Sequence, residues 1–351
     1  MHQPLVNPFV GTGLPDAEAM AVVPSVAVDA VAALLAKCPM HKETPLVSLP
    51  ALATRAGVRE VWCKDESQRM GLGSFKALGA AYVIAQDAAN ANAAHMTTAL
   101  SGKTYVAASA GNHGLSIAAG AQVFGAQAVI FLAETVPEAF ADRLRGFGAR
   151  VERAGDIYEE SMAAAEVAAA DNGWTLLSDS SWPGNTEAAR RVMEGYVQFA
   201  AEITQQIARP PSHVLLQAGV GGMAAAAAAY LRQAWGPEVQ LIVVEPTAAP
   251  ALHDSIAAGK LVDTQGPVSA MGRLDCKTPS MVALAGLSRD ADQFCLLSEV
   301  DAQTGVTVLA EHDLPSTPSG AAGFAALLAG VEGIGTDARV LCILSEGSED
   351  G

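Results

Sequence analysis

Short apolar segments alternate with helical segments of ten or more residues along most of this chain. The pattern is regular over residues 105–177 and returns over residues 213–344. The segments 105–108, 128–132 and 213–217 are typical of buried strands, and each precedes a predicted helix. Such a pattern favours an α/β fold with parallel sheets, because a strand, a helix and a second parallel strand form one right-handed unit.

The two runs of this pattern predict two domains, which suits a chain of 351 residues. We expect a large domain from residues 1–100 and 186–351, and a small inserted α/β domain from residues 101–185. The other predicted strands are 58–63, 150–153, 175–177, 241–245 and 339–344, and the predicted helices are 25–35, 75–85, 114–124, 137–147, 157–172, 185–207, 224–235 and 319–329. Residues 88–101 are predicted as a loop or a frayed helix end.

Charge and cysteine usage exclude several classes of protein. With 21 basic and 37 acidic residues the net charge is −16, so neither nucleic acid nor a membrane surface is expected as a partner. The five cysteines are scattered and the histidines show no metal-ligand spacing, which indicates a reducing cytoplasm and no metal site. No signal peptide is expected, and the longest apolar block, residues 223–231, is too short to span a bilayer, which takes ~20 residues.

Lys76 is the first candidate catalytic residue. It follows a polar loop containing Gly71 and Gly73, and Ser74 is predicted to be the N-cap of the helix over 75–85. A lysine in the first turn lies at the positive end of the helix dipole, which favours the neutral amine. Schiff-base chemistry requires a neutral amine. For a lysine taken alone, an exposed side chain on a helix is the alternative.

Three turns at strand ends are candidate ligand-binding loops. In residues 109–114 (Ser-Ala-Gly-Asn-His-Gly) the backbone amides of a strand-to-helix turn could bind an anion such as a carboxylate, or the turn could be purely structural. Residues 217–224 could hold one phosphate. They also match the dinucleotide fingerprint, with Glu245 ending the next strand. Ser345 follows the last strand, at the edge where parallel sheets bind ligands.

Taken together, these motifs resemble the fold-type II pyridoxal-phosphate enzymes, the tryptophan synthase β superfamily. The resemblance covers residues 44–348, with four separated motifs in the order that the family has. Within that family the chain is most similar to the diaminopropionate ammonia-lyases. The matching stretches are residues 64–76, 179–182, 213–221, 243–246 and 345–347. The resemblance implies two parallel-sheet α/β domains with the cofactor, pyridoxal 5′-phosphate, between them.

The resemblance also implies a role for each motif. Lys76, with Phe75 beside it, would hold the cofactor as a Schiff base and then remove the α-proton of the substrate. Asn112 would bond the phenolic oxygen of the cofactor, and Ser345 would face its pyridine nitrogen. The cofactor phosphate would lie in the loop of Gly219, Val220, Gly221, Gly222 and Met223. The substrate carboxylate would meet Ser109, Gly111, Asn112 and His113, and Asp179 would lie near the β-substituent as a second catalytic residue.

The implied reaction is a β-elimination by a pyridoxal-phosphate lyase that breaks a carbon–nitrogen bond, yielding a 2-oxo acid and ammonia. The first expected substrate is 2,3-diaminopropionate, and a serine, threonine or 3-hydroxy amino acid dehydratase is the alternative. A different class, an NAD(P)-dependent oxidoreductase using Gly219-x-Gly221 and Glu245, stays open, as does a relative that binds the cofactor without catalysis. The small-molecule amino acid is the expected partner, and a homodimer is the expected assembly.

Two departures from the ammonia-lyase pattern carry further expectations. Ala110 stands where those enzymes carry an aspartate that is thought to serve D-isomers, so we expect specificity for L-amino acids and no racemase activity. Residues 271–277 are more charged than the corresponding segment, and Thr317-Pro318-Ser319-Gly320 replaces a version with a glutamate. These residues could belong to the substrate pocket or to a solvated loop.

Overall fold

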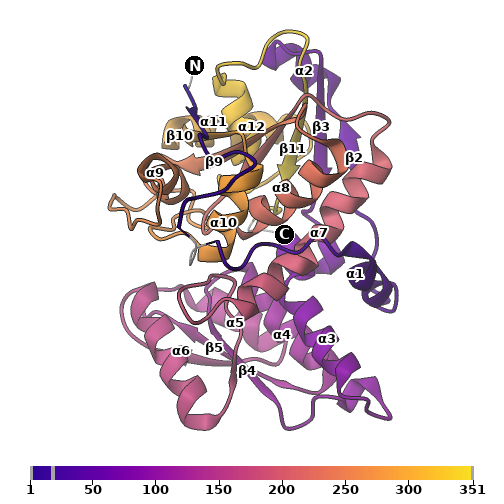
Figure 1. Cartoon of the computed structure of the whole chain (residues 1–351). Coiled ribbons are helices and arrows are strands. Elements are labelled where there is room, and N and C mark those ends of the chain that lie inside the picture. Colours follow the sequence, from indigo (N-terminus) through magenta and orange to yellow (C-terminus); the bar gives the residue numbers. More distant parts are fainter. Residues whose placement is uncertain (1–2, 17–19, 349–351) are drawn as a thin grey trace.

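The computed structural model describes residues 3–16 and 20–348, and it has two lobes, each built on one sheet (Figure 1). Residues 1–2, 17–19 and 349–351 of the predicted large domain lie outside the described residues. Strands and helices alternate through both lobes, so the predicted α/β class with parallel sheets is confirmed.

The large sheet has seven strands in the order β1-β10-β9-β8-β11-β3-β2. Its strands are β1 (Leu5–Val6), β2 (Leu46–Ser48), β3 (Glu60–Asp65), β8 (His213–Gln217), β9 (Gln240–Pro246), β10 (Gln293–Leu297) and β11 (Arg339–Leu344). The five central strands are parallel, whereas β1 and β2 pair antiparallel at the two edges. The sequence predicted four of the central strands, with β3 placed two residues too early, and missed β1, β2 and β10.

The small sheet has four parallel strands in the order β6-β5-β4-β7. Its strands are β4 (Thr104–Ala108), β5 (Gln127–Leu132), β6 (Arg150–Arg153) and β7 (Thr175–Leu176). All four were predicted. The domain boundaries at 100/101 and 185/186 stay predictions, since α3 (Ala80–Asn90) precedes the first boundary and yet packs against α4 (Asn112–Phe124) of the small lobe.

The helices cover the faces of both sheets. Besides α3 and α4, the described helices are α1 (Val28–Leu35), α2 (Pro50–Ala56), α5 (Glu138–Gly146), α6 (Tyr158–Asn172), α7 (Glu187–Gln206), α8 (Gly222–Trp235), α9 (Ala251–Ala258), α10 (Met281–Asp290), α11 (Glu299–Ala310) and α12 (Ala322–Ala329). Sequence analysis left α2, α9, α10 and α11 unassigned. Across the described residues, no helix is long and apolar enough to cross a membrane.

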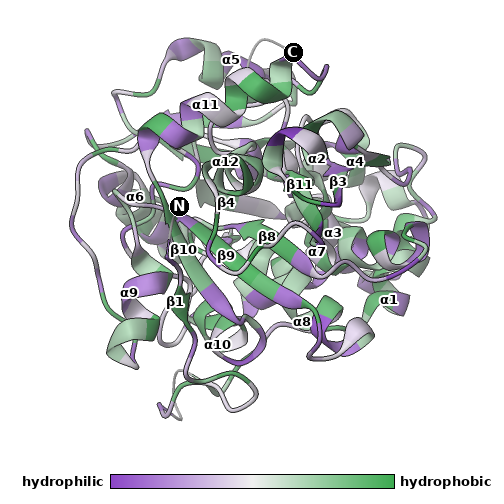
Figure 2. Ribbon diagram, turned by 90° about the horizontal axis from the view of Figure 1, so that it is seen from above, coloured by the Kyte–Doolittle hydropathy of each residue, from purple (hydrophilic) through white to green (hydrophobic). Residues whose placement is uncertain are grey.

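The core runs without interruption from one lobe to the other. Helix α7 passes between the lobes and packs against α3 on one side and α8 on the other (Figure 1). The alanines 224–228 of α8 are fully buried, because small side chains let this helix pack closely between α7 and α10. The apolar strands of the large sheet lie inside a shell of helices, as the hydropathy colouring of Figure 2 shows.

The helix predicted over residues 75–85 is broken. Residues Phe75–Leu78 form a 3-10 turn, Gly79 departs from helical geometry (φ −83°, ψ −87°), and α3 begins at Ala80. Residue 79 has no room for a side chain, because α7 approaches closely: a Cβ on Gly79 would lie 2.5 Å from Cε1 of Tyr196. Ser74 occupies the N-cap position, as predicted, but it precedes the 3-10 turn and its side chain makes no capping hydrogen bond.

Candidate active site between the two lobes

Lys76 is held where β11 ends. The segment just before it pairs with the segment after that strand: Phe75 N donates to Ser345 O at 3.0 Å, and Gly347 N donates to Gly73 O at 3.0 Å. Two residues that sequence analysis singled out 269 positions apart, Lys76 and Ser345, are therefore neighbours in the fold. The predicted cofactor-binding residue Phe75 carries one of these hydrogen bonds.

The Lys76 amine faces a carboxylate. Lys76 Nζ donates to Asp179 Oδ2 in a short ion pair, and the two side chains are 21% and 20% exposed. Burial by itself would lower the pKa of Lys76, but the charge of Asp179 outweighs burial and holds that pKa above its ordinary value. Burial would likewise raise the pKa of Asp179, but the charges of Lys76 and His113 hold it well below its ordinary range.

The expectation of a neutral amine at Lys76 is therefore wrong for the protein as described. The 3-10 turn Phe75–Leu78 supplies only a short dipole at Lys76. The deciding group is Asp179, which the chain brings in from 103 positions away. The attraction between the full charge of Asp179 and the Lys76 amine is stronger than the repulsion from the partial positive charge at a helix N-terminus.

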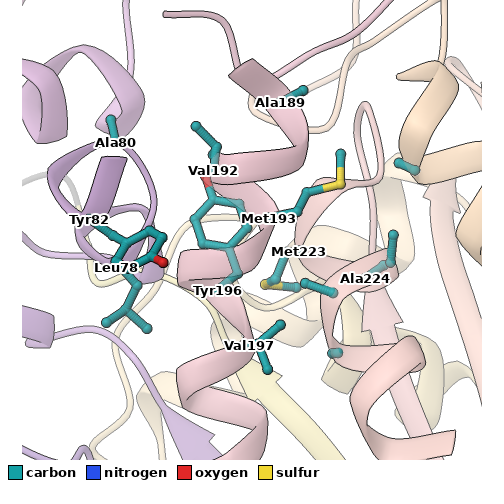
Figure 3. Close-up of a cluster of buried hydrophobic side chains, with 14 of the residues drawn as sticks. Leu78, Ala80, Tyr82, Ala189, Val192, Met193, Tyr196, Val197, Met223 and Ala224 are labelled. Atoms are coloured by element: carbon teal, nitrogen blue, oxygen red, sulfur yellow. The ribbon is translucent and has the colours of Figure 1, made fainter. Parts of the chain in front are cut away.

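Two aromatic rings also flank the Lys76 amine. The Phe75 and Tyr196 ring centroids lie 5.2 Å and 5.7 Å from Nζ, and the rings meet edge to face at 4.9 Å. Figure 3 shows Tyr196 on α7 between Leu78 of the 3-10 turn and Met223 of the glycine loop. Tyr196 is 1% exposed and its hydroxyl has no hydrogen-bond partner within the described residues. Sequence analysis missed Tyr196, which occupies an ordinary core position of a helix.

The predicted carboxylate loop lies at the start of α4. Ser109 Oγ accepts hydrogen bonds from Gly111 N at 3.3 Å and Gly114 N at 3.1 Å, so its side chain shapes the turn. The first backbone N–H groups of a helix lack intrahelical acceptors and can bind an anion. The His113 ring is buried, its Nε2 lies 2.8 Å from Leu177 O, and burial lowers its pKa.

Asn112 contacts a residue that sequence analysis did not select. Its Nδ2 donates to Glu346 Oε2 at 2.5 Å, and the same carboxylate oxygen lies 3.0 Å from Arg273 Nε. Glu346 is 5% exposed, and these three residues line a cavity of about 370 Å³ between the lobes. The position of Glu346 directly after Ser345 was the available signal. Arg273 belongs to the charged segment whose role the sequence left open.

The predicted phosphate loop connects β8 to α8. Gly221 has φ +97°, a left-handed conformation that favours glycine, and Gly222 begins the helix. A Cβ on Gly219 would lie 2.9 Å from Arg273 O and 3.0 Å from Cys276 Sγ, so the segment after residue 271 packs directly on this turn. Val220 accepts a hydrogen bond from Ser280 N at 3.0 Å. The loop thus presents backbone amides in a fixed conformation at a helix start.

The lysine turn (Phe75–Leu78) and the glycine loop (residues 219–223) both lie close to the ring of Tyr196. Tyr196 lies 5.7 Å from Lys76 Nζ by its centroid, and its Cε2 is 3.8 Å from where a Cβ on Gly222 would be. The residues that the resemblance assigns to pyridoxal phosphate thus come together: the Lys76 amine, the glycine loop of residues 219–223, and Ser345 at the strand end. The buried hydroxyls of Tyr196 and Ser74, both without a partner in the described chain, fit a site that a polar ligand completes.

Glu245, the residue that the dinucleotide alternative needs, has another task. Its two carboxylate oxygens accept hydrogen bonds from Leu252 N and His253 N, each at 2.7 Å, at the start of α9. It is 1% exposed, and burial raises its pKa to about 8. This geometry argues against a ribose contact. The part of the chain that the structure describes also has no group of three metal-ligating side chains.

A family model described as "Pyridoxal-phosphate dependent enzyme" matches residues 38–346. The chain belongs to this family. The predicted family and the predicted cofactor are confirmed: the enzyme uses pyridoxal 5′-phosphate. The predicted lyase class is confirmed as well. The individual roles assigned to site residues stay predictions.

Several relatives of this pyridoxal-phosphate enzyme are known. Diaminopropionate ammonia-lyase of Escherichia coli strain K12 is 32% identical over 341 residues, which cover 88% of this chain and 85% of the relative. A serine dehydratase-like protein of Rattus norvegicus is 29% identical over 240 residues, which cover 68% of this chain and 67% of the relative. The structure of the Escherichia coli ammonia-lyase with an aminoacrylate-PLP azomethine reaction intermediate matches with a TM-score of 0.85 at 30% identity, covering 99% of this chain and 94% of that one.

Proposed function

We propose that this enzyme is a β-eliminating ammonia-lyase for β-substituted L-amino acids, and that L-2,3-diaminopropionate is its first substrate. The observation that carries the proposal is the contact between Lys76 Nζ and the Asp179 carboxylate. It puts a base for the α-proton beside an anion that suits a cationic β-substituent. The ammonia-lyase of Escherichia coli, named for this substrate, supports the same assignment.

The other residues fit the binding of the cofactor and the substrate. Lys76 would hold pyridoxal phosphate covalently, with Phe75 beside it, the loop of residues 219–223 on its phosphate, Ser345 at its pyridine nitrogen and Asn112 at its phenolic oxygen. When bound, the cofactor supplies an electron sink for charge that develops at the substrate α-carbon. The amides of Asn112 and His113 would bind the substrate carboxylate at the start of α4, in the turn that Ser109 shapes by accepting from Gly111 N.

The charges of Lys76 and Asp179 suggest how the amine becomes a base. Asp179 keeps the pKa of Lys76 high in the protein as described. A substrate β-ammonium group that pairs with Asp179 would take that counter-ion from Lys76 and add a like charge nearby. Both effects lower the pKa of Lys76, so the amine becomes able to accept the α-proton. The β-nitrogen then leaves as neutral ammonia with the electron pair of the broken carbon–nitrogen bond.

A dehydratase for serine, threonine or a 3-hydroxy amino acid is the second candidate, supported by the serine dehydratase-like relative. A hydroxyl leaving group has no positive charge for Asp179 to hold. The two candidates therefore differ in how much they depend on that carboxylate. We also infer a homodimer, the commonest closed assembly, and a cytoplasmic location, from the cysteine usage.

The test is a panel of L- and D-diaminopropionate, serine, threonine and 3-hydroxyaspartate, scored for ammonia and 2-oxo acid release by the holoenzyme. Asp179→Asn should lower kcat/KM for diaminopropionate by roughly 10- to 100-fold, the worth of a charged hydrogen bond of about 1.5–3 kcal/mol. The same variant should change serine turnover less. Serine turnover that exceeds diaminopropionate turnover in the unaltered enzyme would give the assignment to the second candidate.

Lys76→Ala should abolish turnover and the visible absorption band that borohydride removes. Lys103→Ala is a matched control, because Lys103 also pairs with an aspartate, Asp87, and lies 4.9 Å from an aromatic centroid, Tyr105, away from the site. We expect the control to keep both the band and the activity. Turnover that survives in Lys76→Ala would exclude the proposed base.

A further inference from the structure

Glu346 is a buried carboxylate that none of the roles above uses. Both of its carboxylate oxygens are bound: Oε2 by Asn112 Nδ2 at 2.5 Å with Arg273 Nε at 3.0 Å, and Oε1 by Thr317 Oγ1. Its main chain is fixed as well, since Ser316 Oγ donates to Glu346 O at 2.6 Å. A residue with this many contacts at 5% exposure is held in one position.

The contact with Asn112 joins the two lobes beside the cofactor site. Asn112 is the first residue of α4, in the small lobe, whereas Glu346 follows β11 of the large sheet. Residue 346 also forms a bridge with Ser74, two positions before Lys76. In addition, the carbonyl of its partner Arg273 packs on Gly219 of the phosphate loop. Glu346 is therefore connected to each segment that is predicted to bind the cofactor.

The chemistry of the contact fixes the orientation of Asn112. A carboxamide has an N–H end and an oxygen end of nearly the same shape, so packing alone does not select between them. An ionised carboxylate only accepts hydrogen bonds, so the end of Asn112 that faces Glu346 must be the amide nitrogen. One N–H of that nitrogen is used by Glu346, and the second N–H remains as a donor on the same side of the residue.

We propose that Glu346 is a positioning residue that presents the second N–H of Asn112 to the phenolic oxygen of pyridoxal phosphate. The inference rests on the role proposed for Asn112. Arg273 and Thr317 hold the carboxylate in place, which gives Arg273 of the charged segment a task. A donor at the phenolic oxygen stabilises negative charge there, so Glu346 sets the electronic state of the bound cofactor through Asn112.

Glu346→Gln tests the proposal, because glutamine keeps the shape but can donate to Asn112 Oδ1 and let the carboxamide turn over. The dissociation constant for pyridoxal phosphate should rise about tenfold, the loss of one hydrogen bond of about 1.5 kcal/mol. The visible absorption band of the loaded protein should shift to shorter wavelength. Both readouts come from cofactor titration and do not depend on any substrate.

A double-mutant cycle separates positioning from general structure. Because Glu346 acts through Asn112, Glu346→Gln should add little to the loss of cofactor affinity in Asn112→Ala. Glu311→Gln is the matched control, since it removes the same charge from an exposed ion pair with Arg55, and it should leave band and affinity unchanged. Additive losses in the cycle, or an unchanged band in Glu346→Gln, would overturn the proposal.

Thr317→Val provides a second variant should Glu346→Gln fail to fold. It removes the contact at Oε1 but keeps the carboxylate and Asn112, so it should shift the band in the same direction by a smaller amount. No shift in this variant counts against the inference. If the band responds while no β-substituted amino acid is turned over, the proposed function fails and the role of Glu346 stands.

Discussion

Removing the carboxylate of Glu202 should destabilise the protein strongly, because four charged side chains are buried together beneath the lysine turn. Lys64, Glu66 and Arg69 are fully buried and Glu202 is 1% exposed. Glu202 accepts hydrogen bonds from Lys64 Nζ at 2.7 Å and from Arg69 Nη1 and Nη2 at 2.9 and 2.7 Å, and Glu66 Oε1 lies 2.7 Å from Arg69 Nη2. The positive charges of Lys64 and Arg69 are therefore matched by the negative charges of Glu66 and Glu202.

Two estimates of the effect of Glu202→Gln agree. Removing one member of a buried ion pair typically costs 3–5 kcal/mol, because the remaining charge is left without compensation. Independently, burial opposes ionisation of Glu202, but hydrogen bonds and charges from Arg69 and Lys64 lower its pKa from 4.5 to about 2. At about 1.4 kcal/mol per pH unit, that difference corresponds to about 3 kcal/mol. We therefore expect a loss of about 3 kcal/mol at pH 7.

Urea unfolding of the holoenzyme at pH 7, 4 and 3 is the assay. A carboxylate with a lowered pKa stabilises the fold above its unfolded pKa and loses that contribution as the pH falls through the folded pKa. The difference between the unaltered protein and Glu202→Gln should therefore shrink from pH 4.5 towards pH 2. Lys64 and Arg69 stay protonated over this window, so they do not contribute to the trend.

Glu311→Gln is the control for this measurement as well. Its carboxylate is 56% exposed and pairs with Arg55, so its loss should cost at most about 1 kcal/mol. The reasoning is refuted if Glu202→Gln costs no more than this control at pH 7. It is also refuted if the two curves stay parallel down to pH 3, because the carboxylate would then not be the source of the stabilisation.

Two further predictions concern the ligand-binding loops. Gly219→Ala should raise the dissociation constant for pyridoxal phosphate at least tenfold, measured by cofactor titration, because its Cβ would lie 2.9 Å from Arg273 O and displace the loop. A variant that binds the cofactor normally would show that this turn does not hold the phosphate. Because Ala110 cannot ionise, D-diaminopropionate should be turned over far more slowly than the L-isomer in the same ammonia assay, and comparable rates would contradict the proposed L-specificity.

The parts of the fold that the sequence predicted are those that a local pattern determines. Strands β4, β8 and β11 are apolar, bounded by turns and followed or preceded by helices, so periodicity alone locates them. The edge strands β1 and β2 have two and three residues, too few for any periodicity to show. The close approach of Tyr196 to Gly79 also had no local signal, since that ring comes from α7.

In the candidate site, too, the residues marked by a local pattern were predicted and those placed only by the fold were missed. The glycine loops and Lys76 were predicted because glycines at strand-to-helix turns form a pattern that is visible in the sequence. The charge state of Lys76 was predicted wrongly, because Asp179 comes from a loop after the small sheet and determines it at contact distance. Glu346 and Tyr196 were missed because a glutamate after a strand and a tyrosine within a helix are common, and only the fold places them beside the site.

The network around Glu202 explains how Lys64, Glu66 and Arg69 support the site although no ligand contact is predicted for them. Arg69 begins the 3-10 turn Arg69–Gly71 of the loop that leads to Lys76, and its guanidinium binds Glu202 on α7. The same helix carries Tyr196, which packs against Phe75. Helix α7 therefore holds the chain before Lys76 at two places, by buried charge at Arg69 and by an aromatic contact at Phe75. Because the amine must meet both Asp179 and the cofactor, this rigid support places it more precisely than a loop could.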